Sequence, residues 1–401
     1  MSNSLATSSL ITKEALRILT NMVTFSKNVN RDASEEFDTN QGGKYSSGAT
    51  INIRKPPRFT IRTGATASAQ AVTEPTVPIT LSQAGVDMAF TSAEMTYSLT
   101  QLQPKLTAAM ATIANQIDAD GLLNAKNTVG NIVGTAGTTP ATIGAITAVN
   151  QRLDEMAAPR DGNRSLVLNP AANAGLIGGL AGYFNSAPVL SEQYKKGMMV
   201  DSLGLNIAMD QNVYTHTNGT QVVGGGTVNG ASQTGSTINV NTASITGTIP
   251  KGSVITFAGV YAVNPQSRQS TGVLAQFVVT ADVAASATSI SISPALTPSG
   301  AFQNVTASPA NTATVTVFGT ASTAYTANIG FHRDAFALAV VPMFMPPSGK
   351  GVVAAEQESY EGFSLRMIQF YDGTNDKFIT RFDTLYGWAT PYPELAVKLA
   401  G

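Results

Sequence analysis

The spacing of apolar residues predicts three amphipathic helices. Apolar side chains recur three or four positions apart, which places them on one face of a helix. This pattern covers residues 11–26, 104–121 and 143–156. We expect the second helix to run about five turns, from Pro104, which suits a first turn, to Gly121. Its other faces carry mostly Ala, Thr and Asn, which predicts close packing on several sides, as in a structural spine.

Alternation of apolar and polar residues predicts strands around these helices. Short strands are expected at residues 49–53, 165–168 and 205–209, and a long β-rich excursion at residues 60–91. Prolines interrupt the excursion, and because proline is excluded from central strands, we expect a long, exposed, two-stranded loop. The two later strands, with helices beside them, predict an α/β layer.

The C-terminal part of the chain predicts further strands. Residues 363–371 and 377–385 alternate on either side of Asp372-Gly373, a pair typical of hairpin loops,. The apolar run 335–347 contains prolines and is shorter than the roughly 20 residues of a membrane-spanning helix,. We therefore predict a buried pair of strands there.

A charge-poor block interrupts the α/β layer. Between Val222 and Ala327 only three residues are charged, whereas both flanks are far richer in charge. About a hundred residues is a usual domain size, so we predict a domain inserted into a host domain. Its short strands between Gly, Pro and Asn turns predict a small barrel or sandwich. The expected strands are residues 253–257, 275–280, 289–293 and 314–318, and the three charged residues are Lys251, Arg268 and Asp282.

Composition narrows the class of protein. The 401 residues carry a net charge of −1, so no global field favours nucleic acid or an anionic membrane,. Charged residues make up 12%, about half the usual share,, which suggests a surface covered by neighbouring molecules. The absence of cysteine excludes disulfides and thiolate chemistry,. The first 19 residues lack a basic segment followed by an apolar one, so no secretory signal is expected,.

The sequence gives little support to catalysis. His216 and His332 are the only histidines, no Gly-x-Ser-x-Gly or phosphate-binding loop is present, and a serine nucleophile needs a histidine base. We therefore expect that the protein is not an enzyme and that it has no metal site or cofactor. General acid–base catalysis remains an alternative role for two groups of carboxylates, although such groups usually face solvent or a partner's basic residues. These groups are Glu356, Glu358 and Glu361, and Asp372 with Asp376.

A basic cluster marks the β-rich excursion. It consists of Arg54, Lys55, Arg58 and Arg62, with Phe59 as the one interleaved aromatic residue. Nucleic-acid binding and a solvated loop are both open interpretations. We favour pairing with carboxylates of a neighbouring subunit, because arginine is enriched at protein interfaces.

Three stretches resemble the major capsid proteins of tailed bacteriophages, and more closely the short-tailed phage coat proteins of the P-twenty-two type. Residues 249–261, which read IPKGSVITFAGVY, resemble the opening of that family's inserted β-barrel. Residues 330–341 with 381–388 resemble its closing segment, and Gly204 to Asp210 a strand of its axial domain. The order and spacing of these parts cover nearly the whole chain.

The resemblance implies an α+β architecture, the Hong Kong 97 type phage capsid fold with an inserted small β-barrel. Transferred by position, it implies six parts. These are an N-terminal arm at 1–47, an extended β loop at 48–91, a peripheral domain with the spine helix at 92–142, a first axial part at 143–221, the inserted domain at 222–326, and the rest of the axial and peripheral domains at 327–401.

The resemblance also implies a function and partners. Coat subunits of this family form the pentamers and hexamers of an icosahedral shell, with a scaffolding protein, a portal protein and, in some members, a decoration protein. The precursor is assembled in the bacterial host cytoplasm and expands as double-stranded DNA is packaged without sequence-specific binding. No membrane is involved. Some members cross-link their subunits through Lys and Asn, and although Lys44 and Lys55 lie near the loop, we expect a non-covalent shell.

The resemblance turns the charged features into candidate contacts between subunits. These are Arg54, Lys55, Arg58, Arg62, Glu356, Glu358, Glu361, Lys251, Arg268 and Asp282. An adhesin-like or carbohydrate-binding surface protein is the alternative hypothesis, because it accounts for the Thr- and Gly-rich β block. It does not account for the spine helix or the α/β host.

Overall fold

The chain forms two compact units, each assembled from segments distant in sequence. The computed structural model describes residues 8–31, 50–61, 64–65, 69–72, 74–91, 102–180, 203–347 and 352–401. Unit 1 comprises Met1–Ile53, Val77–Gly121 and Ala337–Ala389. Unit 2 comprises Arg54–Thr76, Leu122–Phe336 and Thr390–Gly401. Over the described residues, no helix combines the length and the hydropathy needed to cross a bilayer.

The predicted N-terminal and spine helices are both present, but the predicted end of the spine helix is wrong. Helix α1 spans Ser8–Met22 and α4 spans Leu102–Thr128, seven residues beyond Gly121. A Cβ atom on Gly121 would lie 2.5 Å from Cζ2 of Trp388 and 2.8 Å from Cε1 of Phe25. This glycine therefore marks close packing inside the helix, not a C-terminal cap.

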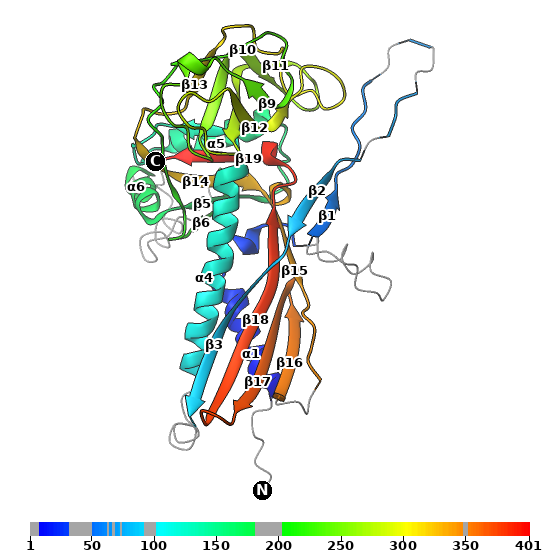
Figure 1. Ribbon diagram of the computed structural model, residues 1–401, viewed down its shortest axis with the longest axis vertical. Helices are drawn as coiled ribbons and strands as arrows, with labels where there is room; N and C mark the ends of the chain where they lie inside the picture. The colour runs from blue at the N-terminus through cyan, green and yellow to red at the C-terminus, as the bar shows by residue number, and fades with distance from the viewer. Residues whose placement is uncertain are drawn as a thin grey trace. The chain divides into compact units, whose positions relative to one another are not determined.

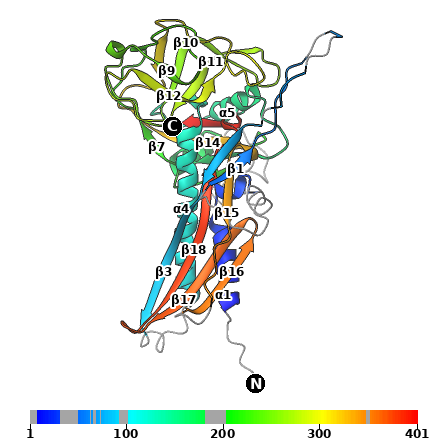
Figure 2. The same cartoon turned by 45° about the vertical axis from the view of Figure 1, so that its right-hand side comes forward.

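Unit 1 contains a sheet built around one long strand, β18 (Lys377–Ala389). The first part of β18 pairs with β17 (Phe363–Asp372) on one side, and β3 (Ser82–Thr91) pairs along most of β18 on the other. The last part of β18 pairs with β15 (Ala337–Val341), and β16 (Val352–Tyr360) pairs with β17. Figures 1 and 2 show β3, β18, β17 and β16 side by side. The predicted hairpin of β17 and β18 is confirmed.

The structure also tests the strands predicted for the excursion at residues 60–91 and for the apolar run at residues 335–347. The exposed two-stranded loop expected at residues 60–91 is only partly correct. Strands β1 (Thr50–Arg54) and β2 (Thr76–Thr80) form a two-stranded ribbon, but Ile51 and Ile79 are buried and residues 82–91 form β3, which belongs to the sheet of β18. The buried pair of strands expected at residues 335–347 is wrong, because only β15 forms there and residues 342–347 carry no strand. Pro342, Pro346 and Pro347 lack the N–H that a ladder needs,.

A buried carboxylate anchors the turn that follows α1. Asp118 on α4 is 3% exposed. Its Oδ2 accepts from the backbone N–H of Thr24 at 2.6 Å and of Phe25 at 3.2 Å. Its Oδ1 accepts from the N–H of Ser26 at 2.9 Å and from the Ser26 hydroxyl at 2.5 Å. These bonds let unit 1 bury the Phe25 ring, which stacks on Trp388 at 5.3 Å.

Unit 2 contains the predicted α/β layer. Its sheet has the order β4-β19-β14-β5-β6, with β7 paired to β14. The strands are β4 (Ile132–Gly134), β5 (Arg164–Leu168), β6 (Asn206–Met209), β7 (Thr215–Thr217), β14 (Ala324–His332) and β19 (Ala396–Ala400). Helices α5 (Ile143–Glu155) and α6 (Pro170–Leu180) share an apolar core with this sheet. A Cβ on Gly330 of β14 would collide with Val149 of α5, so glycine permits this close approach.

The charge-poor block forms a separate antiparallel sheet in unit 2, with the order β8-β13-β10-β11-β12-β9. We call it the insert sheet. Its strands are β8 (Gly226–Thr227), β9 (Gly235–Asn239), β10 (Val254–Val263), β11 (Ser270–Val279), β12 (Ser289–Leu296) and β13 (Thr314–Val317). Figure 1 shows them gathered in one body, from green to yellow. The four predicted strands are present as β10 to β13, whereas β8 and β9 were not predicted.

The two end strands of the insert sheet are joined by backbone hydrogen bonds. The N–H of Asn229 donates to the carbonyl of Asn239 at 3.0 Å, and the N–H of Asn241 donates to the carbonyl of Thr227 at 2.8 Å. A bridge between Val228 and Val240 lies between these bonds. The apolar core of the sheet comes from its own strands and turns, with Met156 from outside the block. The insert sheet is therefore held by residues that are nearly contiguous in sequence.

Candidate subunit-contact surfaces

The basic cluster divides into an exposed part and a part held within the chain. The Arg54 side chain is 69% exposed, and its Nη1 lies 3.9 Å from Oε2 of Glu74, which is 48% exposed. Ion pairs this exposed contribute little to stability. Arg54 is thus available to a neighbouring molecule, while Arg62 lies outside the described residues.

Lys55 and Arg58 both contact the segment before β19. Nη2 of Arg58 donates to Oε1 of Glu394 at 2.7 Å, and its guanidinium lies 5.7 Å from the centre of the Phe302 ring. Nζ of Lys55 lies 5.3 Å from the centre of the Tyr392 ring. Burial lowers the pKa of Lys55, and the nearby carboxylate of Glu394 opposes that shift. The carboxylate partner of Arg58 is thus within its own chain.

Apolar side chains are exposed along the same loop. Phe59, Ile61 and Val72 are 53%, 91% and 66% exposed. Contiguous exposed apolar surface is typical of interaction sites, so these three residues are candidates for a contact with another molecule. From the sequence we predicted contacts for the arginines and noted Phe59 only as an interleaved aromatic residue, although the apolar character of all three residues in a proline-marked loop was visible there.

The three charged residues of the insert do not form one cluster. The Lys251 backbone N–H donates to Oδ1 of Asp282 at 2.7 Å. Arg268 has a left-handed backbone, with φ of +55°. Its Nη2 donates to the carbonyl of Phe59 at 2.8 Å, in the loop that carries the basic cluster.

The C-terminal glutamates lie on β16 and in the turn after it. Glu358 pairs with Lys13 of α1, at 3.5 Å between Oε1 and Nζ. Glu361 has a φ of +48°, and its carbonyl accepts from Nη1 of Arg31 at 2.5 Å. Glu356 faces Met367 across the β16–β17 ladder. Glu358 and Glu361 therefore tie α1 and the segment after it to the hairpin of β16 and β17.

His216 has a hydroxyl partner that the sequence did not reveal. Its Nε2 lies 3.0 Å from Oγ of Ser253, but the two residues are 2% and 0% exposed. Burial, with the positive charges of Lys398 and Lys126, lowers the pKa of His216 to about 4. A substrate has no access to this pair, so the contact is structural.

The remaining candidate acid–base groups serve local structure. Nε2 of His332 lies 3.1 Å from Oδ1 of Asp161. Hydrogen bonds from Asn163 first, and then the His332 contact, hold the pKa of Asp161 below its usual value. Asp372 accepts the Thr374 N–H inside the β17–β18 turn at 2.9 Å. Within the residues that the structure covers, no group of three potential metal ligands is found.

A buried lysine joins the α/β sheet to the insert sheet. Lys398 on β19 is 0% exposed, and its Nζ donates to the carbonyl of Gly252 at 3.1 Å. Burial, together with nearby Lys126, lowers the pKa of Lys398 to about 7. Beside it, the Gln276 amide both donates to and accepts from the backbone of Ile132, at 3.0 and 2.8 Å. The short segment AVKLA gave no signal that its lysine is buried.

Comparison with known families gives one match over nearly the whole chain. The family model described as "P22 coat protein - gene protein 5" matches residues 2–401. A search of curated protein sequences gives no match.

Several solved structures align along most of this chain. A chain of Mycobacterium phage Che8 aligns with a TM-score of 0.50 at 12% identity, covering 94% of this chain and 90% of that one. The capsid of a native GTA particle aligns at 0.43 and 9% identity, covering 88% and 86%. The capsid of Cyanophage P-SCSP1u aligns at 0.40 and 11% identity, covering 88% and 84%. The family match and the alignment with the Che8 chain together show that the α+β fold of this chain is the Hong Kong 97 type expected from its sequence.

Proposed function

Since this chain belongs to the P22 coat protein family and is a structural capsid protein, we propose that its copies form the pentamers and hexamers of an icosahedral shell, first as a scaffold-assisted precursor that expands during DNA packaging. The observation that carries the proposal is the family match over residues 2–401. In the proposed pathway a scaffolding protein and a portal act in the host cytoplasm. The shell encloses double-stranded DNA without reading its sequence and has no enzymatic role. The family assignment removes the reason for the adhesin alternative.

The test is to express the chain alone and with a candidate scaffolding protein, and to image the products by negative-stain electron microscopy. We expect closed shells with the scaffolding protein, and shells or curved sheets without it. A compact monomer at high concentration under both conditions contradicts the proposal. If the shell is non-covalent, boiled particles run as a single band on a denaturing gel, whereas a ladder of multimers contradicts that part.

The six-part division of the chain remains part of the proposal. The arm would be residues 1–47, the extended loop 48–91 and the peripheral domain 92–142. The axial domain would be residues 143–221 with the later part of the C-terminal segment, and the inserted domain 222–326. Residues 327–401 would complete both the axial and the peripheral domains. The hydrogen bonds that join the ends of β8 and β9 support closure of the insert sheet into a small barrel.

We assign the loop's contact with a neighbouring subunit first to its apolar residues. Ile61 is 91% exposed, whereas Arg58 already has Glu394 as its partner. Ile61→Asp should reduce the yield of shells without lowering the melting temperature, because the side chain contacts little within its own chain. Ile61→Val is the matched control and should assemble normally. Equal yields from both variants contradict this role.

The charged residues give a second test of contact roles. Neutralising Lys251, Arg268 and Asp282 together should weaken assembly while the monomer stays folded, as judged by circular dichroism. Charge reversal at Arg54 tests the loop in the same way, because its side chain is 69% exposed. An unchanged yield for the triple variant would leave the insert as a folding aid only.

A further inference from the structure

The sequence contains two Asn-Gly pairs, Asn218-Gly219 and Asn229-Gly230, and both lie in unit 2. The backbone nitrogen that follows an asparagine can attack its side-chain amide, which makes asparagine a thermolabile residue. Glycine after the asparagine favours this attack, because glycine has no Cβ in the way and its backbone reaches conformations closed to other residues. The fold therefore decides which of the two pairs reacts, through the contacts of each amide.

The fold holds Asn218 in place. Asn218 is 5% exposed, and its Nδ2 donates to the carbonyls of Phe318 and Thr320 at 2.8 and 3.0 Å. The backbone is packed closely as well, since a Cβ on Gly219 would lie 2.0 Å from the carbonyl oxygen of Thr248. An attack by the Gly219 nitrogen would have to break both hydrogen bonds in a site without free space. We therefore expect Asn218 to be inert.

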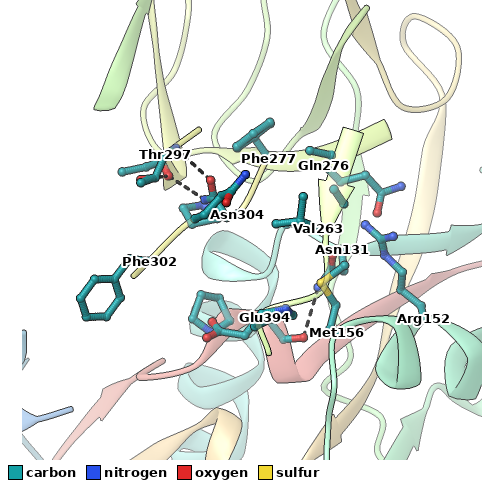
Figure 3. Close-up of a pocket in the computed structure, with 18 of the residues that line it drawn as sticks. Asn131, Arg152, Met156, Val263, Gln276, Phe277, Thr297, Phe302, Asn304 and Glu394 are labelled. Carbon is teal, nitrogen blue, oxygen red and sulfur yellow. Dashed lines mark hydrogen bonds between the residues drawn. The ribbon is translucent and has the colours of Figure 1, made fainter. Parts of the chain in front are cut away.

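Asn304 shows the same use of an amide inside the insert. Its Oδ1 accepts from the backbone N–H of Thr297 at 2.8 Å, and its Nδ2 donates to the carbonyl of Ala295 at 2.7 Å. Figure 3 shows the Asn304 side chain directed toward Thr297, with these contacts as dashed lines. Both ends of this amide are thus fixed by the backbone.

Asn229, just after β8, is placed differently. Asn229 and Gly230 are both exposed, and Gly230 has a φ of +96°. The Asn229 backbone is bound, because its N–H donates to the carbonyl of Asn239 at 3.0 Å and its carbonyl accepts from Nε2 of Gln233 at 2.7 Å. These contacts use the backbone only, so they leave the exposed side-chain amide free to turn toward Gly230.

Asn311, in the loop before β13, holds the attacking nitrogen. Its Oδ1 accepts from the backbone N–H of Gly230 at 2.8 Å. The nitrogen must lose this proton before it attacks, so the reaction requires loss of the hydrogen bond, and a lost hydrogen bond raises the barrier. Asn311 is itself exposed, so its side chain can be removed without opening a cavity in the core.

We propose that Asn229 is a modification site, at which the side-chain amide is lost by cyclisation onto Gly230 at a rate that Asn311 limits. The Gly230 nitrogen gives its proton to solvent and forms a bond to Cγ of Asn229. The bond from Cγ to Nδ2 breaks, and Nδ2 takes up a proton and leaves as ammonia. Water then opens the cyclic imide at either carbonyl, which gives aspartate or isoaspartate. The whole reaction consumes one water, releases one ammonia and needs no partner.

The isoaspartate product changes the join between the two end strands of the insert sheet. Its main chain runs through Cγ, which adds one carbon, and the former Asn229 carbonyl becomes a free carboxylate. In the unmodified chain, Nε2 of Gln233 bonds the carbonyls of Asn229 and Gly230 at 2.7 and 3.0 Å. A longer main chain cannot keep both carbonyls in place. We therefore expect faster hydrogen exchange at the amide of Asn241, which bonds Thr227 across the same join.

The test incubates the full-length unassembled protein in mildly alkaline buffer and follows both pairs by peptide mass spectrometry. Asn229 should convert at least tenfold faster than Asn218, with isoaspartate identified by electron-transfer fragmentation. In denaturant the two pairs should convert at similar rates, because the same residue follows each asparagine. Equal rates in the folded protein, or no conversion of Asn229, overturn the proposal.

Variants test the role of Asn311. Asn311→Ala removes the acceptor and should raise the conversion rate of Asn229 at least threefold, with Asn218 unchanged. Asn239→Ala is the matched control, because this exposed asparagine bonds Asn229 only through its backbone. Melting temperatures of both variants check that each is folded. An Asn311→Ala protein that is folded and converts no faster than the original overturns the proposal.

Asn229→Gln removes the reacting group but keeps an amide. The longer side chain disfavours the cyclic imide, so conversion at this position should stop. The rise in hydrogen exchange at Asn241 on incubation should stop with it. A rise that persists in Asn229→Gln would contradict the link between modification and the join of the end strands.

Discussion

The insert sheet and the α/β sheet lie in the same unit but are stabilised by different chemistry. None of the three charged residues in the block that forms the insert sheet is buried, and the apolar core of the sheet comes almost wholly from residues 226–317. The α/β sheet joins strands from residue 132 to residue 400 and buries charged side chains, among them Arg164 and Lys398. The insert sheet can thus form from local sequence, whereas the α/β sheet needs both ends of unit 2. This difference predicts that the insert sheet folds first.

The largest expected effect tests the apolar core of the insert sheet. Phe277 is 1% exposed, and its ring centre lies 5.6 Å from that of Phe257. Phe277→Ala should lower the free energy of unfolding by about 3–5 kcal/mol. Hydrogen exchange should rise across residues 226–317 while the α/β sheet stays protected.

Val273→Ala is the control for this substitution. Val273 lies on the same strand, β11, but is 41% exposed, so the change should be within about 0.5 kcal/mol. If Phe277→Ala removes protection from both sheets together, the two sheets unfold as one cooperative body and the comparison fails.

The next effect tests the buried charge of the α/β sheet. Arg164 on β5 has a side chain that is 2% exposed. It donates to Oδ1 of Asp154 at 2.8 Å and to the carbonyls of Ala158 and Pro159 at 2.6 and 2.8 Å. Arg164→Met should cost about 3 kcal/mol, at the low end for a broken buried pair, because Asp154 keeps Arg160 as a partner. In the Arg164→Met variant, protection from hydrogen exchange should fall first in the α/β sheet.

Arg160→Met is the matched control, since Arg160 binds the same carboxylate but is 67% exposed. We expect a much smaller change in the melting temperature, because solvent screens an exposed pair. Equal losses in melting temperature for the two variants would show that the burial of Arg164 does not determine how much its ion pair stabilises the fold.

The part of this fold that the sequence could predict is the part governed by local pattern. Alternation located β10 to β13, and apolar spacing located α1, α4 and α5, since these patterns follow from one element facing one core. Gly121 was misread as a helix end because its reason, contact with Trp388, lies 267 positions away in the sequence. Burial of Lys398 was likewise invisible, because lysine is ordinarily exposed and nothing nearby marks it.

The candidate contact residues divide in the same way. The sequence identified the basic cluster but not that Arg58 pairs with Glu394, 336 positions later. Composition identified the insert, yet not that Arg268 reaches the carbonyl of Phe59. Partners between distant segments are set by the tertiary fold, so local pattern cannot supply them.

The third prediction concerns the junction of the two sheets and depends on pH. The pKa of Lys398 falls from 10.5 to about 7 on folding, so the folded chain binds fewer protons than the unfolded chain between these values. Stability should therefore rise from pH 7 toward 10.5, by at most about 1.4 kcal/mol per pH unit, and should be lost again as pH falls to 7.

Chemical denaturation at several values between pH 7 and 9 measures this slope. Lys398→Met should flatten it, because the methionine does not titrate and fills a similar space. His216, whose pKa is about 4 instead of 6.5, gives a separate loss of stability as pH falls from 6.5 to 4, and this loss should persist in the variant. A slope above pH 7 that the variant retains rules out Lys398 as its source.

The smallest expected effect uses two neighbouring glycines of α6 to test how closely the α/β layer is packed. A Cβ on Gly179 would overlap the carbonyl of Ala141, whereas a Cβ on Gly178 would meet nothing within 4 Å. Gly179→Ala should lower stability by about 1–3 kcal/mol, the usual cost of overpacking. Gly178→Ala should raise it by up to about 1 kcal/mol, since alanine favours a helix. Opposite shifts in melting temperature would show that this layer depends on backbone contacts between distant segments, in contrast to the side-chain core of the insert sheet. Shifts of the same sign would contradict this dependence.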